Sequence, residues 1–355
     1  MKVPDWKRSM RRTYEYWKVD PLSWGDVARI DEVTACTITR DLDDELLSNA
    51  TVDLSMSTWE WEDEVYIRVY LVTEQDHVSE RFALGTFLML ATDWNFSGMR
   101  GSSSVTGYSP LKELADDSPP IGYPIGSGNT AQRCVTLASA HCRAPVEPAA
   151  SGEGIAIAEP YVADDDDTWN SFLSGVLAKS GHRLDVTERG HLTIAPIRYP
   201  AAIAPAYVFD DSNSSILRPA VTVSANLPDV PNVVQLIYSR DGGSTIVTRE
   251  DNDPGKPTSL KRRGRRVLYR ETSPELPDNP SQADVEQAAD KVMRDKGAAV
   301  YEVGYEHAFV PDVRPGTGVR LAYSRAGIVV NAMVVSQTIN CTPACLVQET
   351  ARFTK

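Results

Sequence analysis

Acidic side chains are the most concentrated chemistry-bearing groups in the chain. Asp164, Asp165, Asp166 and Asp167 are consecutive, and Ca²⁺ binds hard oxygen ligands of this kind. The run lacks the alternating spacing and the glycine of an EF-hand loop, and it precedes an amphipathic segment that begins at Trp169. Negative charge at a helix N-terminus is favourable by roughly 0.3–1 kcal/mol per group. We interpret the run as a solvated helix cap, with a calcium site as the alternative.

The histidines and cysteines form no recognisable metal-binding pattern. None of the five histidines lies in a His-x-x-x-His or His-Glu-x-x-His pair, which argues against a zinc hydrolase. Cys134, His141 and Cys142 match no common zinc spacing, and Cys341 and Cys345 are interpreted as small residues flanking a turn. Five cysteines, an odd number at low density, imply no disulfide framework and favour a reducing assembly compartment.

Other catalytic signatures are missing from the sequence. It contains no Gly-x-Ser-x-Gly elbow, no Walker A motif and no Gly-x-Gly-x-x-Gly opening a helix. A glycosidase would need two carboxylates, and nothing in the sequence selects such a pair. We therefore predict that the chain is not an enzyme and has no catalytic, cofactor-binding or metal-binding residue.

Composition favours a folded, acidic, multidomain chain. The 355 residues are 42% hydrophobic and 24% charged, with a net charge of −13, so a sizeable core is expected over two to four domains. The negative charge argues against nucleic-acid binding through a basic face. The first twenty residues contain no apolar run, and no stretch reaches eighteen apolar residues, so neither a secretory signal nor a membrane span is expected.

Most of the chain is expected to form β-strands. Residues 50–56 and 65–71 alternate between apolar and polar positions, and residues 82–90 and 103–108 are further strand candidates. Their spacing predicts a barrel or sandwich. Tyr66, Arg68 and Tyr70 occupy the alternate face, which is too aromatic for plain solvent exposure. We predict that these three side chains form a subunit contact.

A small α/β module is expected in the middle of the chain. Residues 109–115 predict a short helix, and Trp169 to Leu177 place their apolar residues on one helical face. A hairpin should then pair Leu184 and Val186 with Leu192 and Ile194. Further on, Ser281 to Asp284 resemble a capping box that opens a helix over residues 281–297.

Two basic segments interrupt the acidic composition. Residues 1–29 carry six basic side chains before residue 20, among aromatic ones, and predict an N-terminal arm that is either solvated or docked on a neighbouring subunit. The second segment spans residues 261–266 and is interpreted as a mobile, solvated loop. The main alternative is contact with an acidic surface of a partner protein, and a further alternative is contact with DNA. Its basic residues are Lys261, Arg262, Arg263, Arg265 and Arg266.

Three passages resemble the tail-hub family of phages, which comprises contractile-tail baseplate hubs and the N-terminal hub part of tail-associated proteins. Residues 39–54 with 66–70 resemble the opening strands of the first hub barrel. Residues 105–114 resemble the strand-to-helix exit from that barrel, and residues 283–321 resemble the late barrel. The order of these passages, more than any one of them, carries the resemblance.

The resemblance implies a mainly β fold (β + α/β) with two tail-tube-like barrels. The expected domains are the arm over residues 1–29, a first barrel over 30–115, a linker and α/β module over 116–200, and a second barrel over 201–355. Such a hub is a homotrimer that adapts a six-fold tail tube to a three-fold tip. The chain stops after the second barrel, so host-binding or wall-degrading activity is expected on other polypeptides.

The partners implied are a tail-tube or distal tail protein above, a tip or spike protein below, and the tape measure protein as a further candidate. DNA would pass through the central channel without specific binding, since an acidic lumen repels phosphates. The expected location is the virion tail tip, after assembly in the host cytoplasm. The alternatives are a distal tail ring, a receptor-binding subunit, and a cell-wall or polysaccharide hydrolase.

Overall fold

The protein is described by a computed structural model covering residues 4–56, 63–89, 93–148, 152–157, 159–200, 203–225, 227–240, 243–272, 276 and 280–354. It is mainly β, with 47% strand and 16% helix, which confirms the predicted mainly β class. The chain divides into two compact units. The first comprises Met1–Val221 and Tyr305–Ala351, and the second comprises Thr222–Gly304 and Arg352–Lys355.

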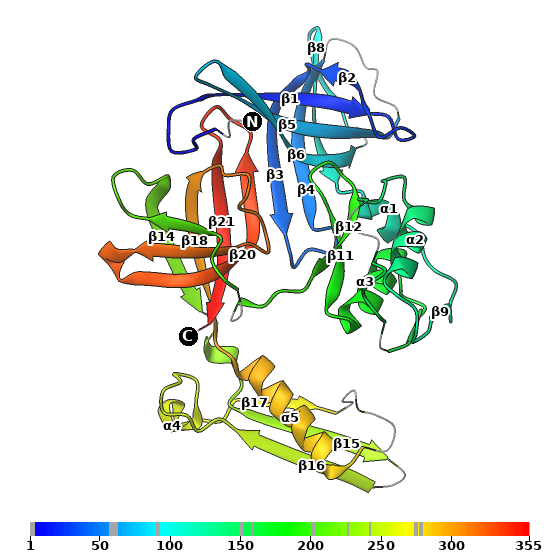
Figure 1. The fold of residues 1–355 in the computed structure, drawn as a ribbon, viewed down its shortest axis with the longest axis vertical. Helices are drawn as coiled ribbons and strands as arrows, with labels where there is room; N and C mark the ends of the chain where they lie inside the picture. The colour runs from blue at the N-terminus through cyan, green and yellow to red at the C-terminus, as the bar shows by residue number, and fades with distance from the viewer. Residues whose placement is uncertain are drawn as a thin grey trace. The chain divides into compact units, whose positions relative to one another are not determined.

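One fourteen-stranded sheet contains most strands of the chain, in the order β14-β18-β21-β20-β3-β4-β8-β6-β5-β1-β2 (Figure 1). Strand β19 pairs with β20 and β13, and β7 pairs with β8. The N-terminal strands are β1 (Arg11–Val19), β2 (Asp26–Ile30), β3 (Val33–Asp41), β4 (Ser48–Met56), β5 (Val65–Gln75), β6 (Val78–Met89), β7 (Asn95–Ser97) and β8 (Arg100–Tyr108). The later strands are β13 (Tyr207–Asp210), β14 (Leu217–Ala225), β18 (Val300–Ala308), β19 (Gly318–Tyr323), β20 (Ile328–Asn340) and β21 (Leu346–Thr354).

Antiparallel pairing of β3 with β20 joins the N-terminal strands to the C-terminal ones. Five residue pairs form this seam, from Ser336 opposite Asp41 to Asn340 opposite Thr37. The strands of the two predicted barrels therefore belong to one continuous sheet. A short 3₁₀ turn (Ser324–Ala326) connects β19 to β20.

The α/β module lies between β8 and β13 in the chain and packs its helices on its own hairpin. Helix α3 contains Trp169, Phe172 and Val176 on its buried side, as its period predicts. Leu184 pairs with Ile194 and Val186 with Leu192, which confirms the predicted hairpin. The elements are α1 (Leu111–Ala115), β9 (Pro124–Ile125), α2 (Gln132–His141), β10 (Tyr161–Val162), α3 (Trp169–Lys179), β11 (His182–Val186) and β12 (Leu192–Pro196).

Strand β5 is buried on both faces, and this explains its unusual sequence. Ile67, Val69 and Leu71 point into the core of the sheet. On the opposite face, Tyr66 belongs to the core of the α/β module, together with Trp24 and residues of α1, α2 and α3. A strand that is covered on both faces has no solvent-exposed side. In β5, aliphatic residues on one buried face therefore alternate with aromatic residues and an arginine on the other.

The predicted N-terminal arm differs from the structure. Residues 11–19 form β1, which pairs with β5 over nine residues, from Arg11 opposite Glu74 to Val19 opposite Tyr66. Residues 26–30 form β2 at the edge of the sheet. Both faces of β1 contribute to cores: Tyr14 and Tyr16 pack in the core of the sheet, whereas Val19, on the opposite face, belongs to the core of the α/β module.

The second unit is an insertion between β14 and β18, within the range predicted as the second barrel. A three-stranded sheet, β16-β15-β17, packs Leu236 and Val247 against Val285 and Ala289 of helix α5. A capping box of Ser281 and Asp284 opens α5, which confirms the predicted helix. The elements are a 3₁₀ turn (Leu227–Asp229), β15 (Val233–Arg240), β16 (Gly243–Glu250), α4 (Leu260–Arg263), β17 (Leu268–Glu271) and α5 (Gln282–Gly297).

Candidate functional site at the docked turn

The turn between β11 and β12 binds the α/β module to the large sheet within the first unit. Backbone hydrogen bonds close it, from the Thr187 amide to the His191 carbonyl at 2.9 Å and from the Gly190 amide to the Thr187 carbonyl at 2.8 Å. Gly190 has φ +77°, a conformation that glycine adopts without steric cost. The turn therefore presents its Glu188 and Arg189 carbonyls to the strands beside it.

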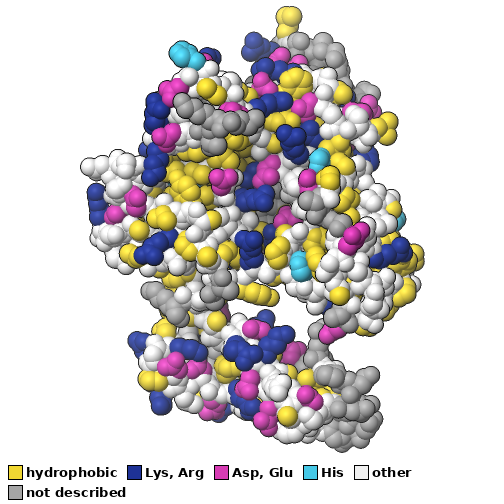
Figure 2. All heavy atoms as spheres, in the orientation of Figure 1, with side chains coloured by type: hydrophobic (Ala, Val, Ile, Leu, Met, Phe, Trp, Pro, Cys, Tyr) yellow, Lys and Arg dark blue, Asp and Glu magenta, His cyan; other side chains and the backbone are white. Residues whose placement is uncertain are grey.

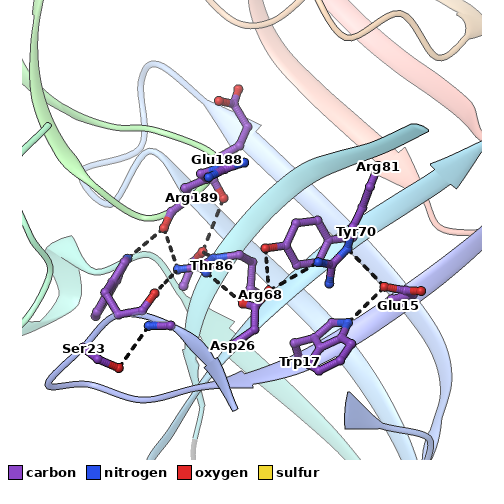
Figure 3. A network of polar contacts seen from close by, with 12 residues as sticks. Glu15, Trp17, Ser23, Asp26, Arg68, Tyr70, Arg81, Thr86, Glu188 and Arg189 are labelled. Carbon is purple, nitrogen blue, oxygen red and sulfur yellow. Dashed lines mark hydrogen bonds and ion pairs between the residues drawn. The ribbon is translucent and has the colours of Figure 1, made fainter. Parts of the chain in front are cut away.

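Arg68 of β5 is the centre of the contacts to this turn (Figure 3). The residue is 5% exposed, and its guanidinium uses all three nitrogens. Nη1 donates to Asp26 Oδ1 at 2.8 Å, and Nε donates to Thr86 Oγ1 at 2.9 Å. Nη2 donates to the carbonyls of Arg189 at 3.0 Å and Trp24 at 3.3 Å. The planar fork of arginine suits such convergent acceptors.

Further donors complete the docking of the turn. The Trp24 indole nitrogen donates to the Arg189 carbonyl at 2.8 Å, and Thr86 Oγ1 donates to the Glu188 carbonyl at 3.3 Å. The Trp24 ring also packs edge-on against Tyr66, with the ring centroids 4.8 Å apart. The Glu188 and Arg189 carbonyls therefore both accept hydrogen bonds, as buried carbonyl groups generally do.

Asp26 carries the compensating charge at the other side of Arg68. Its Oδ2 accepts from the Tyr70 hydroxyl at 2.8 Å and from Arg81 at 3.5 Å. The Arg81 guanidinium lies over the Tyr70 ring, 3.4 Å from its centroid. Burial, followed by the hydrogen bond to Asp26, raises the pKa of Tyr70 above its ordinary value.

The side chain of Glu188 faces two further arginines. Arg314 lies 3.2 Å and Arg40 lies 3.9 Å from Glu188 Oε1. Burial alone would raise the pKa of Glu188, but the two guanidinium groups hold it below its ordinary value. Glu188 is therefore a carboxylate at neutral pH, held between two cations.

A buried chain of polar groups extends from Arg40 into the C-terminal strands. Arg40 donates to Gln337 Oε1 at 3.0 Å, and Gln337 Nε2 donates to Glu349 Oε1 at 2.6 Å. Glu349 also accepts from the Tyr305 hydroxyl at 2.5 Å, and its Oε1 lies 3.2 Å from His307 Nε2. Glu349 is 3% exposed. Burial first, and then the Glu349 charge, raise the pKa of Tyr305 well above its ordinary value.

These two networks are suited to holding strands together. A general base or nucleophile must have a substrate within reach, whereas the groups around Arg68 and Glu349 are directed at one another and closed in by packed strands. Among the described residues, no group of three or more His, Cys, Asp or Glu side chains is placed to hold a metal ion. The arrangement can carry load between the module, the N-terminal strands and the C-terminal strands.

The structure places Tyr66, Arg68 and Tyr70 together on one face of β5, as their spacing predicts. They are, however, 2%, 5% and 6% exposed within this chain. The predicted contact with a second subunit is therefore wrong. The α/β module and the segment around Trp24, both of the same chain, already cover this face. An aromatic face indicates that something covers it, and sequence alone does not say whether the cover is the same chain.

The predicted basic loop is partly a helix. Lys261, Arg262 and Arg263 lie in α4, which Ser259 caps, and Gly264 ends it with φ +68°. Arg263 donates to the Val230 carbonyl at 2.8 Å and to that of Leu227, so it supports the fold of its own unit. Arg266 lies 3.2 Å from Glu250. The exposed members of the segment are Lys261, Arg262, Arg265 and Arg266.

The Asp164–Asp167 run lies next to helix α3, but Thr168 is the residue that caps it, in a reciprocal pair with Ser171. Asp167 accepts from the Ser171 hydroxyl at 2.9 Å and from the Asp164 amide at 2.9 Å. The acidic side chains thus support the cap and organise the preceding turn.

Replacing Gly190 should weaken the docked turn. A Cβ at this position would lie 2.8 Å from Thr86 Cβ and 3.0 Å from the Trp24 ring. We expect Gly190→Ala to lower the free energy of unfolding by about 1–2 kcal/mol for the left-handed backbone, and by about 1–3 kcal/mol more for the clash. Urea unfolding followed by tryptophan fluorescence measures this change.

Gly181→Ala is the matched control, because Gly181 has φ +73° and nothing within 4 Å of the added Cβ. It should show the backbone cost alone. Equal losses in the two variants would contradict a specific packing role for Gly190.

Comparisons with known proteins relate this fold to phage tail proteins. No protein-family model and no curated protein matches the sequence. Among solved structures, a tail protein from Neisseria meningitidis aligns with a TM-score of 0.63 and 12% identity, over 97% of both chains. The 43 kDa tail protein of prophage MuSo2 from Shewanella oneidensis aligns with a TM-score of 0.62 and 12% identity, over 95% of this chain and 97% of that one.

A chain of the Francisella PdpA-VgrG complex aligns with a TM-score of 0.60 and 7% identity, over 98% of this chain and 58% of that one. The resemblance to phage tail proteins predicted from the sequence is thereby confirmed at the level of the fold. The alignments include the sheet, the module and the inserted unit, since they extend over nearly the whole chain.

Proposed function

We propose, from the fold that this chain shares with prophage tail proteins, that it is a structural subunit of a phage tail, namely the hub at the tail tip. The observation that carries the proposal is the alignment over 97% of both this chain and the Neisseria tail protein. A likeness that extends over nearly all of both chains supports a common role more strongly than a likeness limited to one part of the fold would.

In this proposal three copies surround a channel and connect a six-fold tail tube to a three-fold tip. The partners are a tube or distal tail protein above and a spike below, with the tape measure protein as a further candidate. The Francisella neighbour, which is part of a complex named for VgrG, supports a spike-associated position. The chain would reside in the virion at the tail tip after assembly in the host cytoplasm.

The net charge of −13 supports the channel proposal, because a surface that repels phosphates lets DNA pass without binding it. The polar networks suit a load-bearing ring, since they fasten distant strands of the first unit together. Basic and acidic side chains are interspersed on the visible face of the second unit (Figure 2), which fits a protein contact better than a nucleic-acid site.

We also propose that the exposed basic residues Lys261, Arg262 and Arg265 contact an acidic surface of a neighbouring tail protein. Charges at the rim of an interface mainly affect the rate of association and its salt dependence.

Electron microscopy of the purified protein, and of the particle that carries it, tests the proposal. A three-fold ring with a central hole would support the hub. A six-fold ring would favour the second candidate, a distal tail ring, which the shared tail-protein fold also accommodates. A monomer that cleaves bacterial cell-wall glycans and is missing from purified particles would overturn the structural role.

A further inference from the structure

Cys36 and Cys341 lie opposite each other at the end of the seam between β3 and β20. The seam places Ile38 opposite Ile339 and Thr37 opposite Asn340. The backbone continues this register by one residue, since the Cys341 amide donates to the Cys36 carbonyl at 3.0 Å. Directly opposed residues of antiparallel strands point to the same face, so both thiols face the core of the sheet.

The packing agrees with this placement. Cys36 is 5% exposed and belongs to the core of the sheet. Cys341 is half-buried and packs against the same core. Interaction with the Cys36 thiol, followed by burial, raises the pKa of Cys341 above its ordinary value.

The register of the seam gives the two cysteines a Cα spacing within the range of disulfides. Opposed residues of a hydrogen-bonded antiparallel pair have Cα atoms about 5.5 Å apart, and disulfides have Cα separations of about 4.4–6.8 Å. Opposed residues have Cβ atoms about 4.5–5.5 Å apart, whereas a disulfide needs about 3.5–4.5 Å. The bond therefore requires a local adjustment at Cys341, which lies just beyond the end of β20 at Asn340. The third thiol of this region, Cys345, lies in the turn before β21 and is fully buried.

We propose that Cys36 and Cys341 form a disulfide on exposure to an oxidising small-molecule disulfide such as oxidised glutathione, and that this bond locks the seam between β3 and β20. The half-buried Cys341 thiolate attacks the glutathione disulfide, forms a mixed disulfide and releases one glutathione thiol. The Cys36 thiolate then attacks the Cys341 sulfur and releases the second. Two protein thiols are oxidised, and one glutathione disulfide is reduced to two thiols.

This inference goes beyond the proposed function and does not depend on it. The bond would close a loop of about 300 residues. It would tie the N-terminal strands to the C-terminal ones across the pairing of β3 with β20, which joins the two sets in the part of the sheet that the structure describes. A cross-link over a long loop restricts the unfolded chain most. The reaction is expected to be slow at neutral pH and faster at alkaline pH, because the thiolate is the nucleophile.

The test treats the full-length protein with oxidised glutathione, alkylates the remaining thiols and digests the chain with trypsin. The expected product links residues 30–40, which contain Cys36, to residues 326–352, which contain Cys341 and Cys345. The oxidised protein should melt about 5 °C higher or more, reversibly with a reducing agent.

Cysteine-to-serine variants identify which two thiols form the bond. Cys345→Ser should retain the linked peptide, whereas Cys36→Ser or Cys341→Ser should abolish it. The double variant Cys134→Ser with Cys142→Ser is the matched control, since both residues lie in the other core, and it should behave as the parent protein. Recovery of Cys36 and Cys341 as alkylated thiols at every oxidant concentration, or a link that persists without Cys341, would overturn the proposal.

Discussion

Arg68→Ala is expected to lower the free energy of unfolding of the first unit by about 3–5 kcal/mol. The substitution removes four hydrogen-bond donations at once. It leaves the Asp26 carboxylate, with 18% of its side chain exposed, without its main cation, and breaking a buried pair from one side is costly for this reason. All seven tryptophans precede residue 170, so tryptophan fluorescence during urea unfolding reports on the first unit.

Arg81→Ala is the matched control for this prediction. Arg81 contacts the same Asp26, but at 3.5 Å and with 37% of its side chain exposed. An exposed pair of this kind contributes about 0–1 kcal/mol. The Arg81 contacts with Glu15 at 3.1 Å and with the Tyr70 ring add at most about 1 kcal/mol each. A loss in Arg68→Ala no larger than that in Arg81→Ala would show that the docked turn does not depend on the buried guanidinium.

A double-mutant cycle with Asp26→Asn separates the pair from the rest of the network. If the Arg68–Asp26 pair is the dominant contact, the combined variant should lose less stability than the sum of the two single variants. Strict additivity would instead assign the effect of Arg68→Ala to the lost bonds with Trp24, Thr86 and Arg189.

Local patterns were sufficient to predict much of this fold. The hairpin of β11 and β12 and the helix α5 were predictable because their pairing and capping residues lie within a few positions of one another. Helix α2 was missed, because its mixed sequence from Gln132 to His141 contains no side-chain cap and few large apolar residues. Its burial comes from packing on α3 and the module core.

The contacts of the candidate site could not be predicted from the sequence, because they join residues that are far apart in the chain. Arg68 and Arg189 are 121 positions apart, and Arg40 and Gln337 are 297 apart. Contacts of such separation leave no periodic signal. The one available clue was the aromatic and cationic face of β5, which correctly indicated a covered surface. The positive φ at Gly190 favours glycine whatever its neighbours are. The close approach of Thr86 and Trp24, which also leaves no room for a Cβ, is known only from the structure.

Alkaline pH should unfold the first unit cooperatively. Burial is the main cause that raises the pKa of Tyr16, Tyr66 and Tyr305 above the ordinary value of a phenol. The folded state therefore keeps these hydroxyls neutral, whereas the unfolded chain ionises them above about pH 10. Their contribution to stability is fully present below about pH 10 and is lost as the pH rises toward the folded-state values.

Each such group should lower the free energy of unfolding by about 1.4 kcal/mol per pH unit above pH 10. These three tyrosines together contribute about 4 kcal/mol per pH unit, and Tyr14, whose pKa burial also raises, adds to the slope. A domain stable by about 5–15 kcal/mol would then unfold within about one to four pH units. Urea unfolding at several pH values, followed by tryptophan fluorescence, measures the slope. Ultraviolet absorbance of tyrosinate should rise in the same transition.

Tyr66→Phe keeps the buried ring but removes one ionisable hydroxyl, so it should reduce the slope by about 1.4 kcal/mol per pH unit. Tyr199→Phe is the control, because Tyr199 is 69% exposed and its substitution should leave the slope unchanged. A slope that Tyr66→Phe does not alter would mean that this hydroxyl ionises without unfolding. The contact between Tyr66 of β5 and the α/β module would then have to open locally. The module could separate from the sheet at a pH lower than that of global unfolding.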